Sequence, residues 1–317
     1  MKAARRSPRR PLRRLAATPL LAAALLPAAA HAGRPCDDRP PEPGAIAQGM
    51  ALAAEVAGQL EASGADVVLL ARAGQDLGRY GLRWSHLGFA YREPVGEPAP
   101  GGAPGTPPAT PSTTVETVTA AAASASASAS APASAPAPRP AAVWRVAHKL
   151  NLCGTAQAGI FREGLGDFFL DRPARYEAAF VVLSPEAQQR LLPLLRDNAR
   201  LLQWHSPAYS MVAYPWSTRY QQSNQWAIET LAGALEPGAV DRPRAQAWLQ
   251  RQGYQPTDLH LGPLTRLGGR MTRANVAFDD HPSARRFSDH IDTVTVDSIF
   301  AWLPRAGLAG GEPVLVH

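Results

Sequence analysis

The sequence has few cysteines and lacks several common catalytic motifs. Two cysteines, Cys36 and Cys153, occur in 317 residues. There is no Cys-x-x-Cys pair, no phosphate-binding glycine loop, no Gly-x-Gly-x-x-Gly fingerprint and no Gly-x-Ser-x-Gly elbow. These absences argue against a thioredoxin-like protein, a nucleotide-binding enzyme and an α/β-hydrolase. We therefore expect no cofactor.

Long apolar runs are also absent beyond the N-terminus. A transmembrane helix needs about 20 consecutive apolar residues, and no stretch after residue 32 reaches that length. Residues 1–32 have the features of a signal peptide: basic residues, an apolar segment from Leu15 to Ala30 and a small-x-small site ending at Ala32. The sequence predicts a periplasmic or secreted protein, cleaved after Ala32, with no membrane span. The arginine pairs leave a twin-arginine route open, which Pro11 disfavours.

The positive charge of the chain belongs to this N-terminal segment. The whole chain has 32 basic and 26 acidic residues, for a net charge of +6. Residues 1–32 hold seven of the basic residues and no acidic one, so the remainder has 25 basic residues against 26 acidic ones, a net charge of −1. Nucleic-acid binding needs a basic face. The mature chain is therefore not expected to bind nucleic acid.

A tract rich in proline, alanine, serine and threonine interrupts the rest of the chain. It covers residues 94–141, and its composition offers almost nothing to bury, which predicts a disordered insertion. An interdomain linker is the alternative, but it would leave residues 46–93 too short for a core of their own. We expect one domain made of residues 33–93 and 142–303, followed by a C-terminal tail at 304–317.

The spacing of apolar residues predicts a mixed set of helices and strands. Helices are expected at residues 46–62, 156–169, 185–196, 223–235 and 243–252, with Ser184 and Pro185 as a typical helix start. Strands are expected at residues 66–73, 86–92, 143–150 and 176–183, which are rich in branched and aromatic side chains. The sequence predicts an α+β fold in which helices pack on one side of an antiparallel sheet.

Two of the expected strands each carry a histidine, His86 and His148. If the tract is looped out, these strands are neighbours in one hairpin, and the imidazoles lie about 5 Å apart at their Cβ atoms. Such a pair provides a base and a group that orients it. A structural role for both histidines is the alternative, since half-buried imidazoles often bond a carbonyl.

The two cysteines both lie in the exported part of the chain. Two thiols in an oxidising compartment usually pair, so a disulfide between Cys36 and Cys153 is expected. A free, catalytic Cys153 is the alternative, which requires a neighbouring base.

Three short motifs resemble the circularly permuted branch of the NlpC-type papain-like superfamily. They are Ser85-His86-Leu87-Gly88, the strand with His148, and the helix that starts at Ser223-Asn224. The resemblance implies a papain-like architecture in which His86 is the base and His148 orients its ring. The start of the helix, Ser223 or Asn224, is then the nucleophile position.

Longer phrases are similar to the bacterial exported family DUF2145, over most of residues 34–303. They are Asn151-Leu152-Cys153-Gly154-Thr155, Gly164-Leu165-Gly166-Asp167-Phe168-Phe169 and Ser223-Asn224-Gln225-Trp226. That family brings no known activity with it.

The chain departs from the papain-like pattern at the nucleophile. No cysteine follows Gly154, and a hydroxyl at Ser223 is a far weaker nucleophile than a thiolate. Ser223 is also a natural helix N-cap. We therefore favour a non-catalytic binding module of the cell envelope, with peptidoglycan peptide or another envelope component as partner. The alternative is an amidase or peptidase that uses His86 as its base.

Two further groups suggest ligand sites. Trp84, Trp204, Trp216 and Trp226 could line a groove for a sugar or peptide, although tryptophans usually lie in cores. The second group collects acidic and imidazole side chains: Asp279, Asp280, His281, Asp289, His290 and Asp292. Because Arg285 and Arg286 would neutralise these carboxylates, we expect no metal there.

Overall fold

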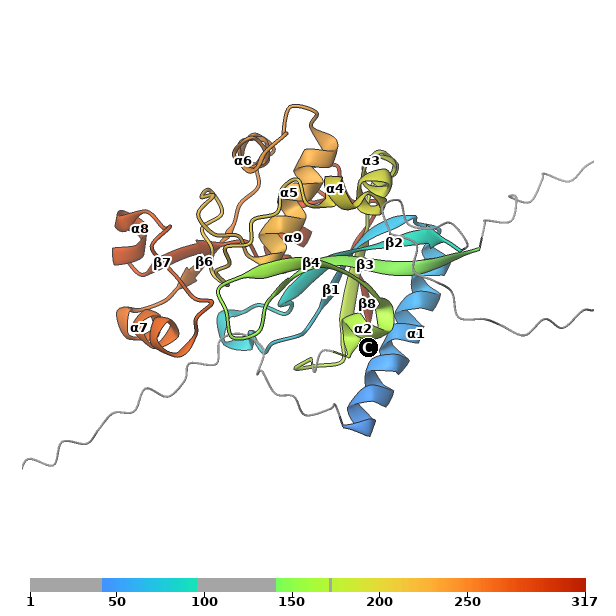
Figure 1. The fold of residues 1–317 in the computed structure, drawn as a ribbon, viewed down its shortest axis with the longest axis horizontal. Coiled ribbons are helices and arrows are strands. Elements are labelled where there is room, and N and C mark those ends of the chain that lie inside the picture. The colour runs from blue at the N-terminus through green and yellow to red at the C-terminus, as the bar shows by residue number, and fades with distance from the viewer. Residues whose placement is uncertain (1–41, 96–140, 171–172) are drawn as a thin grey trace, which may run out of the picture.

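The computed structural model describes residues 42–95, 141–170 and 173–317. A six-stranded antiparallel sheet forms its centre, with the strand order β4-β3-β2-β1-β5-β8 (Figure 1). A two-stranded ribbon of β6 and β7 lies beyond one end of this sheet. The protein therefore has the mixed α+β fold that the sequence predicts.

The elements have the following bounds. The large sheet contains β1 (Val67–Arg72), β2 (His86–Pro94), β3 (Ala142–Asn151), β4 (Ala158–Gly164), β5 (Ala178–Val182) and β8 (Val314–Val316). The ribbon contains β6 (Thr257–His260) and β7 (His290–Thr293). The helices are α1 (Pro43–Ser63), α2 (Leu165–Phe169), α3 (Pro185–Arg196), α4 (Asn198–Leu201), α5 (Ser223–Leu235), α6 (Arg242–Arg251), α7 (Pro263–Thr272), α8 (Ser283–Phe287), α9 (Val296–Trp302) and the 3-10 helix η1 (Gly78–Tyr80).

The strands β2 and β3 are antiparallel neighbours, although the long tract separates them in sequence. Their register pairs Phe89 with Ala147. Just past the end of β2, the amide of Val95 donates to the carbonyl of Ala141 at 3.1 Å. The predicted hairpin is confirmed, and the two ends of the tract meet at its tip. Residues 96–140 themselves lie outside the described residues.

Helices cover both faces of the sheet, so the expectation that they pack on one side is wrong. α1 and α2 cover one face, and α3, α5, α6 and α9 cover the other (Figure 1). Successive side chains of a strand point to opposite faces, and in β1 Leu69 joins one core while Leu70 joins the other. All six residues of β1 are buried, as expected for a strand covered on both faces.

Two of the predicted helices owe their boundaries to capping groups. The hydroxyl of Ser184 accepts a hydrogen bond from the Ala187 amide at 3.4 Å, and Pro185 occupies the first turn of α3. α1 ends at Gly64, whose φ of 69° lies in the left-handed region that favours glycine. Both boundaries lie within a few residues of those that the sequence predicts.

Two segments differ from the sequence-based expectation. The sequence predicts a helix over residues 156–169, but Ala158–Gly164 form β4 and only Leu165–Phe169 are helical. β4 pairs with β3 along its whole length, so tertiary pairing and not local propensity decides the conformation of this segment. Residues 304–317, expected as a tail, contribute β8, which pairs with β5 at the edge of the sheet.

The N-terminal predictions fall outside the part of the chain that the structure describes. The expected signal peptide, residues 1–32, and Cys36 belong to this segment. Within residues 42–95, 141–170 and 173–317, no helix combines the length and the apolar character needed to cross a bilayer.

The hairpin geometry generates a first prediction. Replacing residues 96–140 by a short turn should preserve cooperative unfolding, because the chain ends that the turn must join already meet. A roughly tenfold shorter connection lowers the entropy cost of loop closure by about 2 kcal/mol, so the free energy of unfolding should stay equal or rise by up to that amount. Urea unfolding followed by circular dichroism measures it. A loss of the cooperative transition would contradict the hairpin.

Candidate functional site

His86 and His148 lie in contact on the face of the sheet covered by α1 and α2. The Nε2 atom of His86 is 2.9 Å from the Nδ1 atom of His148, and the ring centroids are 5.2 Å apart. The β2–β3 register places Gly88 opposite His148, with His86 two residues away on the same face. A Cβ atom at Gly88 would come within 2.8 Å of Val146 Cγ1 and 3.1 Å of His148 Cβ, so this close approach requires glycine.

Glu163 on β4 extends the pair into a chain of three groups. Its Oε2 atom is 3.0 Å from Nε2 of His148. An ionised Glu163 accepts a hydrogen bond from the Nε2–H group of His148, which leaves Nδ1 of a neutral His148 as the acceptor for a hydrogen bond from His86. The carboxylate thereby sets the tautomer of one imidazole, and that imidazole orients the next. Glu163 is not among the residues predicted from the sequence, because the predicted helix over residues 156–169 is a strand at this position.

His86, His148 and Glu163 together form what we call the histidine chain, and Phe168 and Arg72 enclose it. The ring centroid of Phe168 lies 5.8 Å from that of His86 and 5.2 Å from that of His148. The guanidinium of Arg72 lies 4.7 Å above the same phenyl ring and donates to the Phe168 carbonyl. His148 is fully buried and His86 is 8% exposed. Chemically, such a chain can hold a proton or transfer it between a buried imidazole and the partly exposed Glu163 carboxylate.

Ser223 and Asn224 do not join this group. They begin α5, which packs on the opposite face of the sheet, where the Trp226 ring contacts that of Phe89 at 5.9 Å. The cap of α5 is Gln222, whose side chain accepts from the Asn224 amide at 3.1 Å, so the expectation of Ser223 as N-cap is wrong by one residue. Burial raises the pKa of the neighbouring Tyr209, and a hydrogen bond with Ser223 opposes that rise.

A second buried polar network occupies the α5 side of the sheet, and it includes Lys149. The Nζ atom of Lys149 donates to Gln221 at 2.7 Å and to the Ser206 carbonyl at 2.6 Å. Gln221 in turn donates to the buried Glu229 at 2.5 Å, and Arg242 pairs with Glu229 at 2.7 Å. Burial lowers the pKa of Lys149 to about 6; Arg242 adds to the shift and Glu229 opposes it.

A sequence signal for this network exists. Lys149 is the only lysine after Lys2, in a chain that otherwise uses arginine. An amine can lose its proton when buried, whereas a guanidinium cannot. Lysine is therefore the basic side chain that can become neutral at this buried position.

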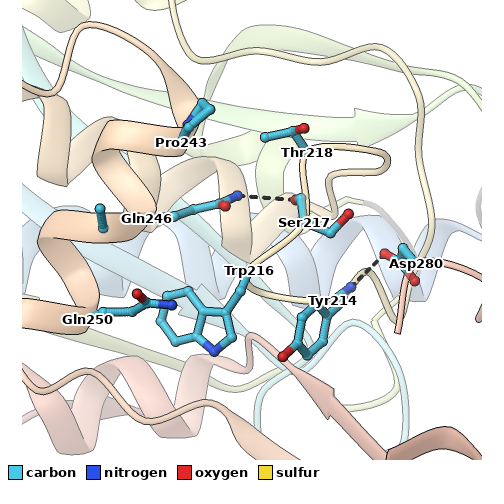
Figure 2. A pocket seen from close by; sticks show the side chains of 9 residues that line it. Tyr214, Trp216, Ser217, Thr218, Pro243, Gln246, Gln250 and Asp280 are labelled. Carbon is cyan, nitrogen blue, oxygen red and sulfur yellow. Dashed lines mark hydrogen bonds between the residues drawn. The ribbon is translucent and has the colours of Figure 1, made fainter. Parts of the chain in front are cut away.

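A surface pocket of about 590 Å³ lies beyond this network, between the 214–218 segment and α6. Figure 2 shows Trp216 and Tyr214 side by side along one wall, with Gln250 next to the indole. The complete lining is Tyr214, Trp216, Ser217, Thr218, Pro243, Gln246, Ala247, Gln250 and Asp280. None of these residues is basic, and none belongs to the histidine chain.

Buried contacts hold the walls of the pocket in place. Gln246 donates to the Ser217 carbonyl at 3.1 Å and to Glu229 at 2.6 Å, so the pocket and the Lys149 network share a member. Asp280 accepts from the Tyr214 amide at 2.8 Å (Figure 2). Of the four tryptophans proposed as groove residues, only Trp216 lines this pocket; Trp84, Trp204 and Trp226 are buried in the main core.

The acidic and imidazole residues between 279 and 292 do not gather around one point. Three of the carboxylates form ion pairs with arginines: Asp279 with Arg219, Asp289 with Arg266, and Asp292 with Arg285. Asp280 and His281 bond each other at 2.9 Å. The expected neutralisation is confirmed for Arg285, whereas Arg286 donates to the Phe278 carbonyl at 3.3 Å. The sequence neighbours of His290 do not form a ligand set with it.

Cys153 is not a free thiol. This excludes the alternative in which Cys153 acts as a free catalytic nucleophile. Cys36 lies outside the described residues, so its pairing with Cys153 stays a prediction.

Comparisons with known proteins assign a family and no activity. The model of the family DUF2145, described as "Uncharacterized protein conserved in bacteria", matches residues 59–100 and 122–303. No curated protein and no solved structure matches the chain. The papain-like resemblance therefore has no structural relative to support it.

The burial of Lys149 predicts a pH-dependent stability. Its folded pKa of about 6 lies below the ordinary 10.5, so between these values the unfolded chain binds a proton that the folded chain does not. Stability from this group is therefore lost as pH falls through that window, by up to about 1.4 kcal/mol per pH unit. Lys149→Met should remove this slope between pH 7 and 9. Denaturant unfolding measures it, with Arg145→Met, exposed on the same strand, as the control; equal slopes in all three proteins would refute a neutral buried amine.

Proposed function

Since the chain belongs to DUF2145, a family of uncharacterized proteins conserved in bacteria, we propose a function from the geometry of its sites. The protein is an exported binding module of the cell envelope. It takes an uncharged, hydroxyl-bearing ligand in the Trp216 pocket. The observation that carries this proposal is the aromatic wall of Trp216 and Tyr214 in a pocket of about 590 Å³.

The composition of the pocket favours a saccharide-like ligand. A sugar ring offers apolar C–H faces that stack on an aromatic ring, and hydroxyl edges that bond amides and hydroxyls. Here Trp216 and Tyr214 supply the flat surfaces, while Gln250, Ser217 and Thr218 supply polar groups. The absence of a basic residue from the lining argues against a phosphate or another anionic ligand.

The rigidity of the pocket supports a binding role. Behind Trp216 lies the buried Tyr254, whose ring centroid is 6.1 Å from that of the indole. Gln246 ties the Ser217 backbone to the buried Glu229. A wall that is held before the ligand arrives loses less conformational entropy on binding, which improves affinity.

The position of the expected nucleophile supports binding over catalysis. In the papain-like interpretation, a thiolate begins the helix that here begins with Ser223 and Asn224. Ser223 begins α5, which lies across the sheet from His86. We therefore propose that any papain-like ancestry survives as a degenerate, non-catalytic fold.

An envelope location rests on the N-terminal sequence. Residues 1–32 have the charge and apolar pattern of an export signal. The ligand class that we propose is the sugar part of the peptidoglycan, because its hydroxyl-bearing rings suit a pocket without basic residues.

Binding of muropeptides tests this proposal. The full chain should bind a soluble disaccharide-peptide, and Trp216→Ala should weaken binding about tenfold or more, a loss of about 1.4 kcal/mol of stacking. Gln250→Ala should weaken it roughly twofold to tenfold, the value of one hydrogen bond. Isothermal titration calorimetry gives both values.

The control variant changes a glutamine that lies outside the pocket. Gln255 is exposed and outside the pocket, so Gln255→Ala should bind as the wild type does. Titrations with the disaccharide alone and with the free stem peptide show which half is recognised. Equal affinities for wild type and Trp216→Ala would exclude this pocket as the binding site.

The histidine chain favours a second candidate function, a cell-envelope amidase or peptidase with His86 as its base. A carboxylate that orients one imidazole, which orients another, is an arrangement that supports proton transfer. This candidate requires a nucleophile, or an activated water, on the α1–α2 side of the sheet.

Product analysis separates the two candidates. Under the binding proposal, muropeptides stay intact after incubation with wild type, with His86→Ala and with Ser223→Ala, as measured by chromatography and mass spectrometry. Cleavage by wild type that disappears in His86→Ala would establish the second candidate. Cleavage that also disappears in Ser223→Ala would mean that α5 contributes to the reaction despite its place across the sheet.

A further inference from the structure

The β6–β7 ribbon presents two histidines and an aspartate on its outer face. The register pairs His260 with His290 directly across the two strands, and Asp258 lies two residues before His260 on the same face. Leu259 and Ile291 point the other way, into a small core with Leu82, Leu261 and Phe278. The ribbon is therefore anchored from behind, and its outer face holds Asp258, His260 and His290 at fixed positions, with Asp292 directly opposite Asp258.

The three side chains already converge. One ligand atom from each lies within 4.8 Å of the others. Nδ1 of His290 is 2.6 Å from Oδ2 of Asp258, Nε2 of His260 is 4.0 Å from the same oxygen, and the imidazole centroids are 4.5 Å apart. The His260 side chain is 71% exposed, so its ring can turn toward a shared point without disturbing the core.

This ligand set matches a particular class of metal ion. Two imidazoles and one carboxylate suit Zn²⁺, Ni²⁺, Cu²⁺ or Co²⁺, while hard ions such as Ca²⁺ and Mg²⁺ prefer oxygen ligands. Three protein ligands leave one or more positions open for water or for another ligand.

A neighbouring arginine contacts the Asp258 carboxylate and has a second carboxylate partner of its own. Arg285 lies 3.2 Å from Oδ2 of Asp258, but it also donates to Asp292, with its Nε atom 2.9 Å from Oδ2. When a cation takes the Asp258 oxygen, Arg285 keeps its pair with Asp292, so no charge is left unpaired. Hydrogen bonds to a ligating carboxylate are common around protein metal sites.

We propose that Asp258, His260 and His290 form a site for a divalent transition-metal ion. The ion binds to the surface of the ribbon through two ring nitrogens and one carboxylate oxygen. The site shares no residue with the Trp216 pocket or the histidine chain, and the proposal is independent of the function proposed above.

Calorimetric titration with Zn²⁺, and separately with Ni²⁺, tests the site. The untagged full chain should bind one ion per chain at pH 7.5. His260→Gln and His290→Gln should each weaken binding roughly 100-fold or more, and Asp258→Asn should weaken it at least tenfold, as expected when a ligand or its support is lost. Wild-type affinity should fall as the pH is lowered, because metal ions and protons compete for the same ligand atoms.

A matched control uses the exposed His317, which lies outside the cluster. His317→Ala should bind as the wild type does, and the metal-free variants should unfold at the wild-type midpoint. Binding that persists in both His260→Gln and His290→Gln would overturn the proposal. So would the absence of binding for both ions.

Discussion

The placement of β3 between β2 and β4 is the constraint on which the other features depend. Both faces of β3 are covered along residues 146–149, so consecutive residues there point into different cores. His148 enters the histidine chain on the α1–α2 side, and Lys149 enters the polar network on the α5 side, with both side chains fully buried. A shift of the register by one residue would exchange these faces. The β2–β3 pairing, which joins chain segments on either side of residues 96–140, therefore determines both polar systems at once.

Burying a polar group costs desolvation free energy. In this protein, networks of hydrogen bonds and ion pairs with shared partners offset that cost. Glu229 is fully buried and is bonded by Arg242, Gln221 and Gln246. Buried ion pairs add little net stability compared with apolar packing, so their main effect here is to fix geometry. Gln246 carries that effect to the surface, because it links Glu229 to the wall of the pocket at Ser217. The buried network around Glu229 thus holds in place the pocket wall where a ligand would bind.

The chemically interesting groups are divided among separate places in the fold. The histidine chain lies under α2, the aromatic pocket lies beside α6, and the β6–β7 ribbon carries its own imidazoles. The large sheet separates the first two, since α5 and α6 pack on the face opposite His86. A hydrolase of the papain type needs base and nucleophile on one side of the sheet. The fold places His86 and Ser223 on different sides, which is the geometric reason for favouring a binding module.

The sequence by itself determined the features that local chemistry controls. Capping groups set the ends of α1 and α3, the lengths of the apolar runs marked the inner strands, and the composition of the tract implied that β2 and β3 meet. It did not reveal β4, because residues 158–163 have no strong local preference and become a strand only by pairing with β3, which brings Glu163 to His148. Tertiary packing alone decided which face of the sheet each helix covers, and hence whether Ser223 meets His86. A periodic apolar pattern shows that one face of a helix is buried, but it does not show which surface that face packs against.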